Sequence, residues 1–400
     1  MPNGLPGVSI TVENGALGRV ATTKDGVAGL IMVGVSLSLI PLYTPKQIFS
    51  LKEAENLGLT QENDTDQKLD CWKQIKEFYD EAGSGAELWI MTAALTRTMT
   101  ELLDPNTTTN GASKLLDAAD GKIRLLGMSR FIDSTVTYDQ VTVGGLDEDV
   151  ANCLVKAQAL AIAYRNAFKP VQILIDGRGW NGNIANLTDL RTLTHSKVSV
   201  VLGATNAGKS AAIGLTLGRQ AKLPVQRSLA RVKDGALNVT AMYLTNGALL
   251  STFSDAQIGQ IHGKAYIVPR RITGRSGFYF TDNPTATLAN DDYLTIANNR
   301  VIDKALTIVY DTYINEINDE IELSADGKLA PTKVSYYKAI INNALSTLMV
   351  SEGECSAAEV DIDAEQNVLT TDRIDIVVRI TPVGYAKAIE VSLGFKNPAA

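Results

Sequence analysis

A regular alternation of apolar strand patterns and amphipathic helices through the middle of the chain constrains its fold most. Buried strands are predicted at residues 88–92, 123–128, 171–175 and 198–202, with short helices at 115–119 and 207–221. A longer helix is predicted at residues 147–168, where one face carries Val150, Leu154, Ala157, Ala161 and Tyr164. Strand–helix–strand alternation of this kind favours a mostly parallel sheet, so we predict an α/β domain.

The last third of the sequence has a different pattern. Two helices are predicted at residues 300–323 and 333–350, followed by three strands at 358–362, 373–380 and 388–395. Helices followed by a group of strands indicate an α+β unit.

At the other end, Val8, Ile10 and Val12 alternate with polar residues, which predicts a strand, and a second strand is expected at 27–39. A helix is then expected at 46–57, a solvated loop at 60–68 and a helix ending near residue 79.

A chain of 400 residues exceeds what one ordinary hydrophobic core uses. We predict that residues 1–45 form an N-terminal arm and strands that join the C-terminal domain. Residues 46–285 are expected to form the middle α/β domain, and residues 286–400 the C-terminal α+β domain.

The composition excludes several kinds of site. The formal net charge of −7 argues against a nucleic-acid partner, which would require clustered Lys and Arg. The three cysteines are far apart and lack zinc-site spacing, and the only histidines are His195 and His262, in polar contexts typical of surface residues. We predict no metal site, and the longest apolar stretch, at 29–42, is too short for membrane insertion.

One segment matches a phosphate-binding motif. Residues 203–210 read G-x-x-x-x-G-K-S, with Gly203, Gly208, Lys209 and Ser210 at the defining positions, between a predicted strand and a predicted helix. However, Gly214 and Gly218 weaken the helix by about 1 kcal/mol each relative to alanine, and no acidic strand end for magnesium follows the loop. We interpret the match as accidental, with a strand, a turn and a glycine-tolerant helix packed closely together. A P-loop NTPase is the enzymatic alternative.

Two other groups of charged residues are weaker candidates. Asp176 and Arg178 follow a predicted strand and could mark a ligand crevice, although a solvated turn is the simpler interpretation. Arg270, Arg271 and Arg275 form a local basic cluster, which in so acidic a chain suggests an interface salt bridge rather than nucleic-acid contact.

The C-terminal third resembles the tail sheath proteins of contractile phages and related injection systems. The residues that carry the resemblance are N-R-V-I-D-K-A at 299–305, the segments 360–363 and 367–371, the run D-R-I-D-I-V-V-R-I-T-P-V-G-Y-A-K-A-I at 372–389 and the closing strand 390–395. The segments 213–219 and 225–236 resemble the middle domain of the same family more loosely.

This resemblance implies a structural subunit without cofactor or catalytic site. Such a subunit polymerises as stacked rings around an inner tube protein, between baseplate and terminator proteins, and contracts to drive the tube through a target envelope. It would be synthesised in the bacterial cytoplasm and become part of a phage tail or injection-system particle. A static tube or baseplate protein is a further alternative.

The resemblance also assigns roles to particular residues. The terminal segments of sheath proteins are exchanged between subunits as added strands, which here implies Val8, Ile10 and Val12 at one end and Ile389, Val391 and Leu393 at the other. In the family the C-terminal domain lines the tube, so Lys333 and Lys338 on the second predicted helix are candidates for contact with an acidic tube surface. Both lysines also suit a simple solvated helix face.

Overall fold

A computed structural model describes residues 24–131, 142–324 and 327–395. The predicted strand of Val8, Ile10 and Val12 lies outside the described residues. The chain divides into two compact units, Met1–Thr307 and Ile308–Ala400. We refer to them as unit 1 and unit 2.

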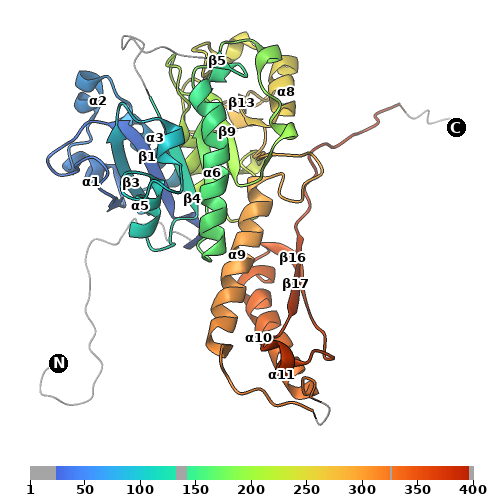
Figure 1. Cartoon of the computed structure of the whole chain (residues 1–400). Helices are drawn as coiled ribbons and strands as arrows, with labels where there is room; N and C mark the ends of the chain where they lie inside the picture. The colour runs from blue at the N-terminus through green and yellow to red at the C-terminus, as the bar shows by residue number, and fades with distance from the viewer. Residues whose placement is uncertain (1–23, 132–141, 325–326, 396–400) are drawn as a thin grey trace, which may run out of the picture. The chain divides into compact units, whose positions relative to one another are not determined.

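Unit 1 is built around a seven-stranded sheet with the strand order β12-β9-β7-β4-β1-β3-β2 (Figure 1). All neighbouring strands in it are parallel except β2, which pairs antiparallel with β3 at one edge. The predicted mostly parallel sheet is therefore confirmed. Its strands are β1 (Ala28–Gly34), β2 (Lys46–Ile48), β3 (Leu88–Ala94), β4 (Leu125–Ser129), β7 (Gln172–Asp176), β9 (Val198–Val201) and β12 (Tyr266–Ile267).

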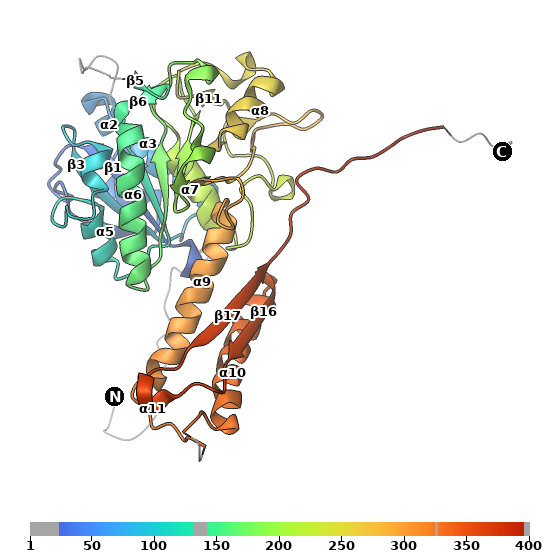
Figure 2. The same cartoon turned by 45° about the vertical axis from the view of Figure 1, so that its right-hand side comes forward.

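Helices cover both faces of this sheet (Figures 1 and 2). On one face lie α3 (Cys71–Ala82) and α7 (Ile213–Lys222), and on the other α5 (Ala112–Ala118) and α6 (Glu148–Asn166). The interior strands are buried on both sides, which explains their nearly continuous apolar sequences. The remaining helices of unit 1 are α1 (Leu51–Asn56), α2 (Gln61–Gln67), α4 (Met99–Leu102), α8 (Asp255–Gly263) and the first part of α9 (Ile296–Tyr313).

Two glycines allow α3 and α7 to pack unusually closely. A Cβ atom at Gly214 would lie 2.6 Å from the carbonyl carbon of Gln74, and one at Gly218 would lie 2.9 Å from the Cα of Phe78. The Gln74 side chain joins the helices, since its Oε1 accepts from the Gly214 N–H at 2.7 Å and its Nε2 donates to the Ala211 carbonyl at 3.0 Å. The predicted close packing of this glycine-containing helix is confirmed.

Short strand pairs form the loops around the sheet. They are β5 (Thr142–Val143) with β6 (Leu146–Asp147), β8 (Thr194–His195) with β15 (Ala286–Thr287), β10 (Gly203–Ala204) with β11 (Tyr243–Leu244), and β13 (Pro269–Arg270) with β14 (Tyr279–Phe280). No helix in the described part of the chain has the length and apolar character needed to cross a bilayer.

Unit 2 contains the end of α9, a 3₁₀ turn (Ile314–Glu316), α10 (Pro331–Leu345) with a π-helical turn (Ser346–Val350), and α11 (Val368–Thr371). Its two strands, β16 (Cys355–Ile362) and β17 (Ile376–Pro382), pair antiparallel, and α10 packs against β16. A small core includes Leu329, Tyr337 and Ile362. The expected order of helices followed by antiparallel strands is observed.

Several predicted elements differ from the structure. Residues 46–48 form an edge strand rather than the start of a helix. The expected loop at 60–68 contains α2, whose first turn is capped because Thr60 Oγ1 accepts from the Asn63 N–H at 3.1 Å. The helix predicted to reach residue 323 ends at Tyr313, and the chain then passes through Asn318 in a left-handed conformation (φ 65°).

Strand β1 also lies elsewhere than predicted. We expected residues 27–39 to join the C-terminal domain, but β1 lies in the middle of the unit 1 sheet, between β3 and β4. Its seven residues are all buried, which suits a central strand covered on both faces. The domain boundaries predicted at residues 45 and 285 are not tested by this structure and remain predictions.

Candidate assembly site

The loop that matches a phosphate-binding motif uses its polar groups within the protein. Asp176, at the end of β7, accepts hydrogen bonds from the Ser210 hydroxyl and, at 2.6 Å, from the Ala211 N–H. The carboxylate is fully buried, and this burial raises its pKa to about 6. The hydrogen-bond donors at the end of the loop are therefore already used by a carboxylate of the protein itself.

The start of α7 is also displaced from the motif. The helix begins at Ile213, later than the predicted residue 207 and beyond the motif's last residue. Lys209 is exposed, and its carbonyl accepts from the Gly179 N–H at 2.8 Å. In a phosphate-binding loop the lysine lies at the helix N-terminus, where free N–H groups converge on the ligand. These differences support our interpretation of the match as accidental, which stays a prediction.

The charged residues near Asp176 form a buried network rather than a solvated turn. Arg178 is only 5% exposed and pairs with Asp147 at 2.8 Å, so the solvated-turn interpretation is wrong. Arg130 pairs with Asp149 at 3.1 Å, and Asp149 also accepts from the Met99 N–H at 2.7 Å. The network connects the carboxyl end of the sheet to α4 and α6.

Both histidines lie in peripheral elements. His195 is half-buried in β8, and this burial lowers its pKa. His262 is half-buried in the last turn of α8. Within residues 24–131, 142–324 and 327–395, no group of three His, Cys, Asp or Glu side chains could hold a metal ion.

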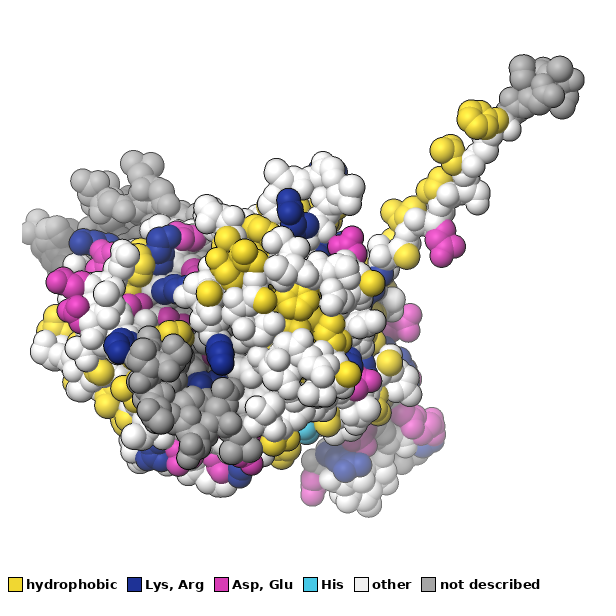
Figure 3. All heavy atoms as spheres, turned by 90° about the horizontal axis from the view of Figure 1, so that it is seen from above, with side chains coloured by type: hydrophobic (Ala, Val, Ile, Leu, Met, Phe, Trp, Pro, Cys, Tyr) yellow, Lys and Arg dark blue, Asp and Glu magenta, His cyan; other side chains and the backbone are white. Residues whose placement is uncertain are grey.

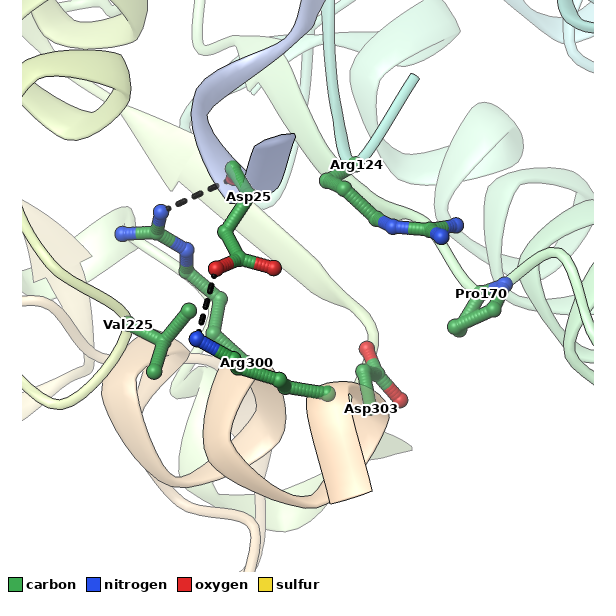
Figure 4. Close-up of a pocket in the computed structure, with 7 residues that line it drawn as sticks. Asp25, Arg124, Pro170, Val225, Arg300 and Asp303 are labelled. Carbon is green, nitrogen blue, oxygen red and sulfur yellow. Dashed lines mark hydrogen bonds and ion pairs between the residues drawn. The ribbon is translucent and has the colours of Figure 1, made fainter. Parts of the chain in front are cut away.

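The N-terminal half of α9 is anchored to unit 1 by charged side chains around a small pocket (Figure 4). Arg300 donates to the carbonyls of Leu223 at 3.1 Å and Asp25 at 3.1 Å. Lys304 pairs with Asp25 at 2.9 Å, and Asp303 pairs with the buried Lys197 at 2.6 Å. Arg300 and Asp303, which carry part of the sheath resemblance, therefore hold α9 in place. Sequence reasoning missed Asp25 and Lys197, which lie far from α9 in the chain and belong to no motif.

The two-stranded sheet of unit 2 has open edges. β17 pairs with β16, and no other strand of the described residues joins either of them. The chain continues beyond β17 as an exposed tail without assigned strand structure, so residues 388–395 do not form the predicted strand within the single chain.

Apolar side chains alternate along this tail with small or polar ones. Ile389, Val391, Leu393 and Phe395 are 81%, 78%, 96% and 110% exposed. Figure 3 shows hydrophobic side chains along the tail with nothing packed over them. A period of two is the pattern of a β-strand, although this tail pairs with no described strand of its own chain.

The two candidate tube-facing lysines lie on α10 in unit 2 and both have neighbours there. Lys338 Nζ is 3.2 Å from Asp361 Oδ1 on β16. Lys333 Nζ lies 5.8 Å from the centre of the Tyr336 ring, within the range of a cation–π contact. The structure does not bring either lysine together with the apolar tail residues in a common site.

Comparisons with known proteins agree on the family and the fold. Residues 5–284 match the DUF2586 N-terminal domain and residues 292–400 match the DUF2586 C-terminal domain. No curated protein sequence matches the chain.

Solved structures with the same fold include chains of contractile assemblies. A chain of the anti-feeding prophage helical sheath in the contracted state is 14% identical, with a TM-score of 0.63 over 98% of this chain and 99% of the other. A chain of the PVC sheath complex, from an extracellular contractile injection system in the contracted state, is 14% identical, with a TM-score of 0.63 over 99% of both chains.

The sheath tail protein from Listeria innocua is 10% identical, with a TM-score of 0.52 over 90% of this chain and 92% of the other. At these identities the likeness concerns the fold. The chain belongs to the DUF2586 family, and it has the fold of contractile sheath proteins.

Proposed function

We propose that this protein is the structural subunit of a contractile sheath. Copies polymerise as stacked rings around an inner tube, and the sheath contracts to drive that tube through a target envelope. The fold supports this proposal because the likeness to sheath chains covers almost the whole length of both proteins. The particle is a phage tail or an injection system, and its baseplate and terminator proteins complete the set of partners.

The exposed C-terminal tail is the observation that carries the proposal. Its apolar side chains gain free energy only when another surface covers them, and full burial is worth about 1.5–3 kcal/mol for each large side chain. The open edges of β16 and β17 offer backbone hydrogen bonds to an added strand. We infer that the tail of one copy adds to the sheet of a neighbour and that Val8, Ile10 and Val12 act in the same way at the other end.

Exchanged strands also suit a machine that moves. A strand shared by backbone hydrogen bonds keeps neighbouring subunits linked while the compact units rotate as rigid bodies. The energy of contraction then comes from subunit contacts that differ between the extended and contracted lattices, without a cofactor or nucleotide. A static tube or baseplate protein would keep one lattice under all conditions.

Self-assembly of the purified protein tests the proposal. Electron microscopy should show tubes for the parent chain. Ile389→Ser with Val391→Ser and Leu393→Ser should give a folded protein that forms no tubes. Ala388→Ser with Glu390→Ser, which changes the opposite face of the same strand, is the matched control and should assemble. A parent chain that stays monodisperse in every condition, with or without tube protein, would contradict the proposal.

We also propose that α10 contacts the inner tube through Lys333 and Lys338. Single exposed charge pairs contribute about 0–1 kcal/mol, so the contact depends on repetition around the rings. Lys333→Glu with Lys338→Glu should leave the melting temperature of the monomer nearly unchanged and weaken co-assembly with the tube protein. Lys328→Glu, at a lysine that is likewise paired on the surface of unit 2, is the control. Normal co-assembly of the double variant would place the tube contact elsewhere.

A further inference from the structure

A hairpin of unit 1 carries three exposed arginines. Strands β13 and β14 are joined by a loop at residues 271–278, and Arg270, Arg271 and Arg275 are all exposed. The hairpin contains no acidic residue, and within the described part of the chain no carboxylate forms an ion pair with any of the three. Figure 2 shows the loop projecting beside α8.

Hydrogen bonds within the hairpin and to Leu237 hold its backbone. The Arg275 N–H donates to the Ile272 carbonyl at 3.0 Å, and the Phe278 carbonyl accepts from the Leu237 N–H at 2.8 Å. The Tyr279 hydroxyl donates to the Ser276 carbonyl at 3.3 Å. The backbone that carries the arginines is thus fixed, which lowers the backbone entropy lost when the hairpin binds a partner.

A segment of unit 2 has the complementary charge. Residues 311–322 contain five carboxylates and no Lys or Arg. Asp311, Asp319, Glu320 and Glu322 are exposed and form no ion pair with another described residue, whereas Glu316 accepts from the Tyr336 hydroxyl at 3.0 Å. Among the described residues, no ion pair neutralises these four carboxylates, as is also the case for the arginines of the hairpin.

We propose that the arginine hairpin of one copy binds the acidic segment of a neighbouring copy. This inference rests on the proposed function, since it requires copies of the chain to pack against one another. The protein's net charge of −7 makes copies repel one another on average, so a concentrated basic hairpin can give a specific electrostatic attraction. Arginine suits this role because its planar group binds carboxylates through two hydrogen bonds.

Charge reversal tests the contact. The first variant, the reversed hairpin, carries Arg270→Glu, Arg271→Glu and Arg275→Glu. Its net charge is −13 instead of −7, because each substitution changes the charge by −2. Asp319→Lys with Glu320→Lys and Glu322→Lys is the reversed acidic segment. Sedimentation and electron microscopy then measure tube formation by each variant alone, by a chain that carries both reversals and by an equal mixture of the two single-reversal chains.

We expect each reversal alone to lower the sedimented fraction at least tenfold. Both the doubly reversed chain and the mixture should recover assembly, because a reversed hairpin can then meet a reversed acidic segment. If the doubly reversed chain recovers assembly and the mixture does not, the hairpin and the acidic segment meet within one chain. That result would overturn the inference. Recovery by neither, or normal assembly of the reversed hairpin alone, would also overturn it.

A matched control separates this contact from general repulsion. Lys122→Glu with Lys209→Glu and Lys222→Glu gives the same net charge through three exposed lysines of unit 1. This variant should assemble as the parent does, and a loss equal to that of the reversed hairpin would refute the specific contact. Tubes formed by the parent chain establish assembly independently, so failure of this inference is distinct from failure of the proposed function.

Discussion

Replacing Gly214 with alanine should force α3 and α7 apart. The added methyl group would overlap the backbone of Gln74, whose carbonyl carbon lies 2.6 Å from the ideal Cβ position. Backbone atoms of a packed helix cannot rotate away as the end of a flexible side chain can. The helices must therefore separate, which also stretches the two hydrogen bonds of the Gln74 side chain at 2.7 and 3.0 Å.

The size of the effect is the sum of two costs and one gain in the free energy of unfolding. Overpacking costs about 1–3 kcal/mol, and weakening two buried hydrogen bonds costs about 1 kcal/mol each. Alanine returns about 1 kcal/mol because it favours the helical state more than glycine does. The free energy of unfolding should fall by about 2–4 kcal/mol. Unit 1 spans residues 1–307, and with an unfolding entropy of about 2.1 cal/mol/K per residue this loss lowers Tm by about 3–6 °C.

Thermal unfolding followed by circular dichroism measures this change, with Gly259 as the control. Gly259 is an exposed residue of α8 whose added Cβ would meet nothing within 4 Å. Gly259→Ala should therefore raise the unfolding free energy by up to about 1 kcal/mol. If Gly214→Ala melts at or above the parent temperature while Gly259→Ala behaves as expected, close helix packing is not the reason for glycine at 214.

Three further predictions concern buried and motif residues. Burial raises the pKa of Asp70 to about 7 and that of Asp176 to about 6. The folded state therefore binds more protons than the unfolded state between about pH 4 and 7. The free energy of unfolding, measured by denaturation, should fall as pH rises through this range, and it should fall less steeply in Asp70→Asn. Lys197→Met should cost about 3–5 kcal/mol because it leaves Asp303 buried without its partner, whereas adding Asp303→Leu should recover much of that loss in the same assay. Lys209→Ala should assemble as the parent does, and calorimetry should detect no magnesium-dependent ATP binding; a saturable signal that this substitution abolishes would restore the NTPase alternative.

The sheet of unit 1 could be predicted because its strands are apolar on both faces. Strands β3, β4, β7 and β9 all lie within about two residues of their predicted positions. Helix α6 is also close to its predicted range, since its apolar residues follow the helical period over five turns. A pattern that repeats over many residues predicts its helix or strand even where single residues depart from it.

Short elements and the placement of β1 could not be predicted in the same way. Helix α2 is almost entirely polar, and its N-terminal cap at Thr60 is its main sequence signal. The central position of β1 depends on pairing with strands about 60 and 97 residues further along the chain, which no local pattern encodes.

The site residues show the same division between local and distant information. The alternating apolar tail was visible in the sequence because its period is local. The late start of α7 was not, because the loop before it is held by Asp176 from a different strand. The buried pair of Lys197 and Asp303 likewise joins residues that are 106 positions apart.

If the protein is a sheath subunit, as we propose, the central position of β1 has a mechanical consequence. A 3₁₀ turn at Lys24–Gly26 leads into this strand, which is hydrogen-bonded to β3 over seven residues and to β4 over five. A pull along the strand axis loads both parallel ladders in shear, so many bonds must break together. At the other end, the tail leads into β17, which is bonded to β16 alone among the described strands. We therefore expect β1 to withstand a larger force before its hydrogen bonds break. When both ends are pulled with equal force, the β16–β17 pair should separate first.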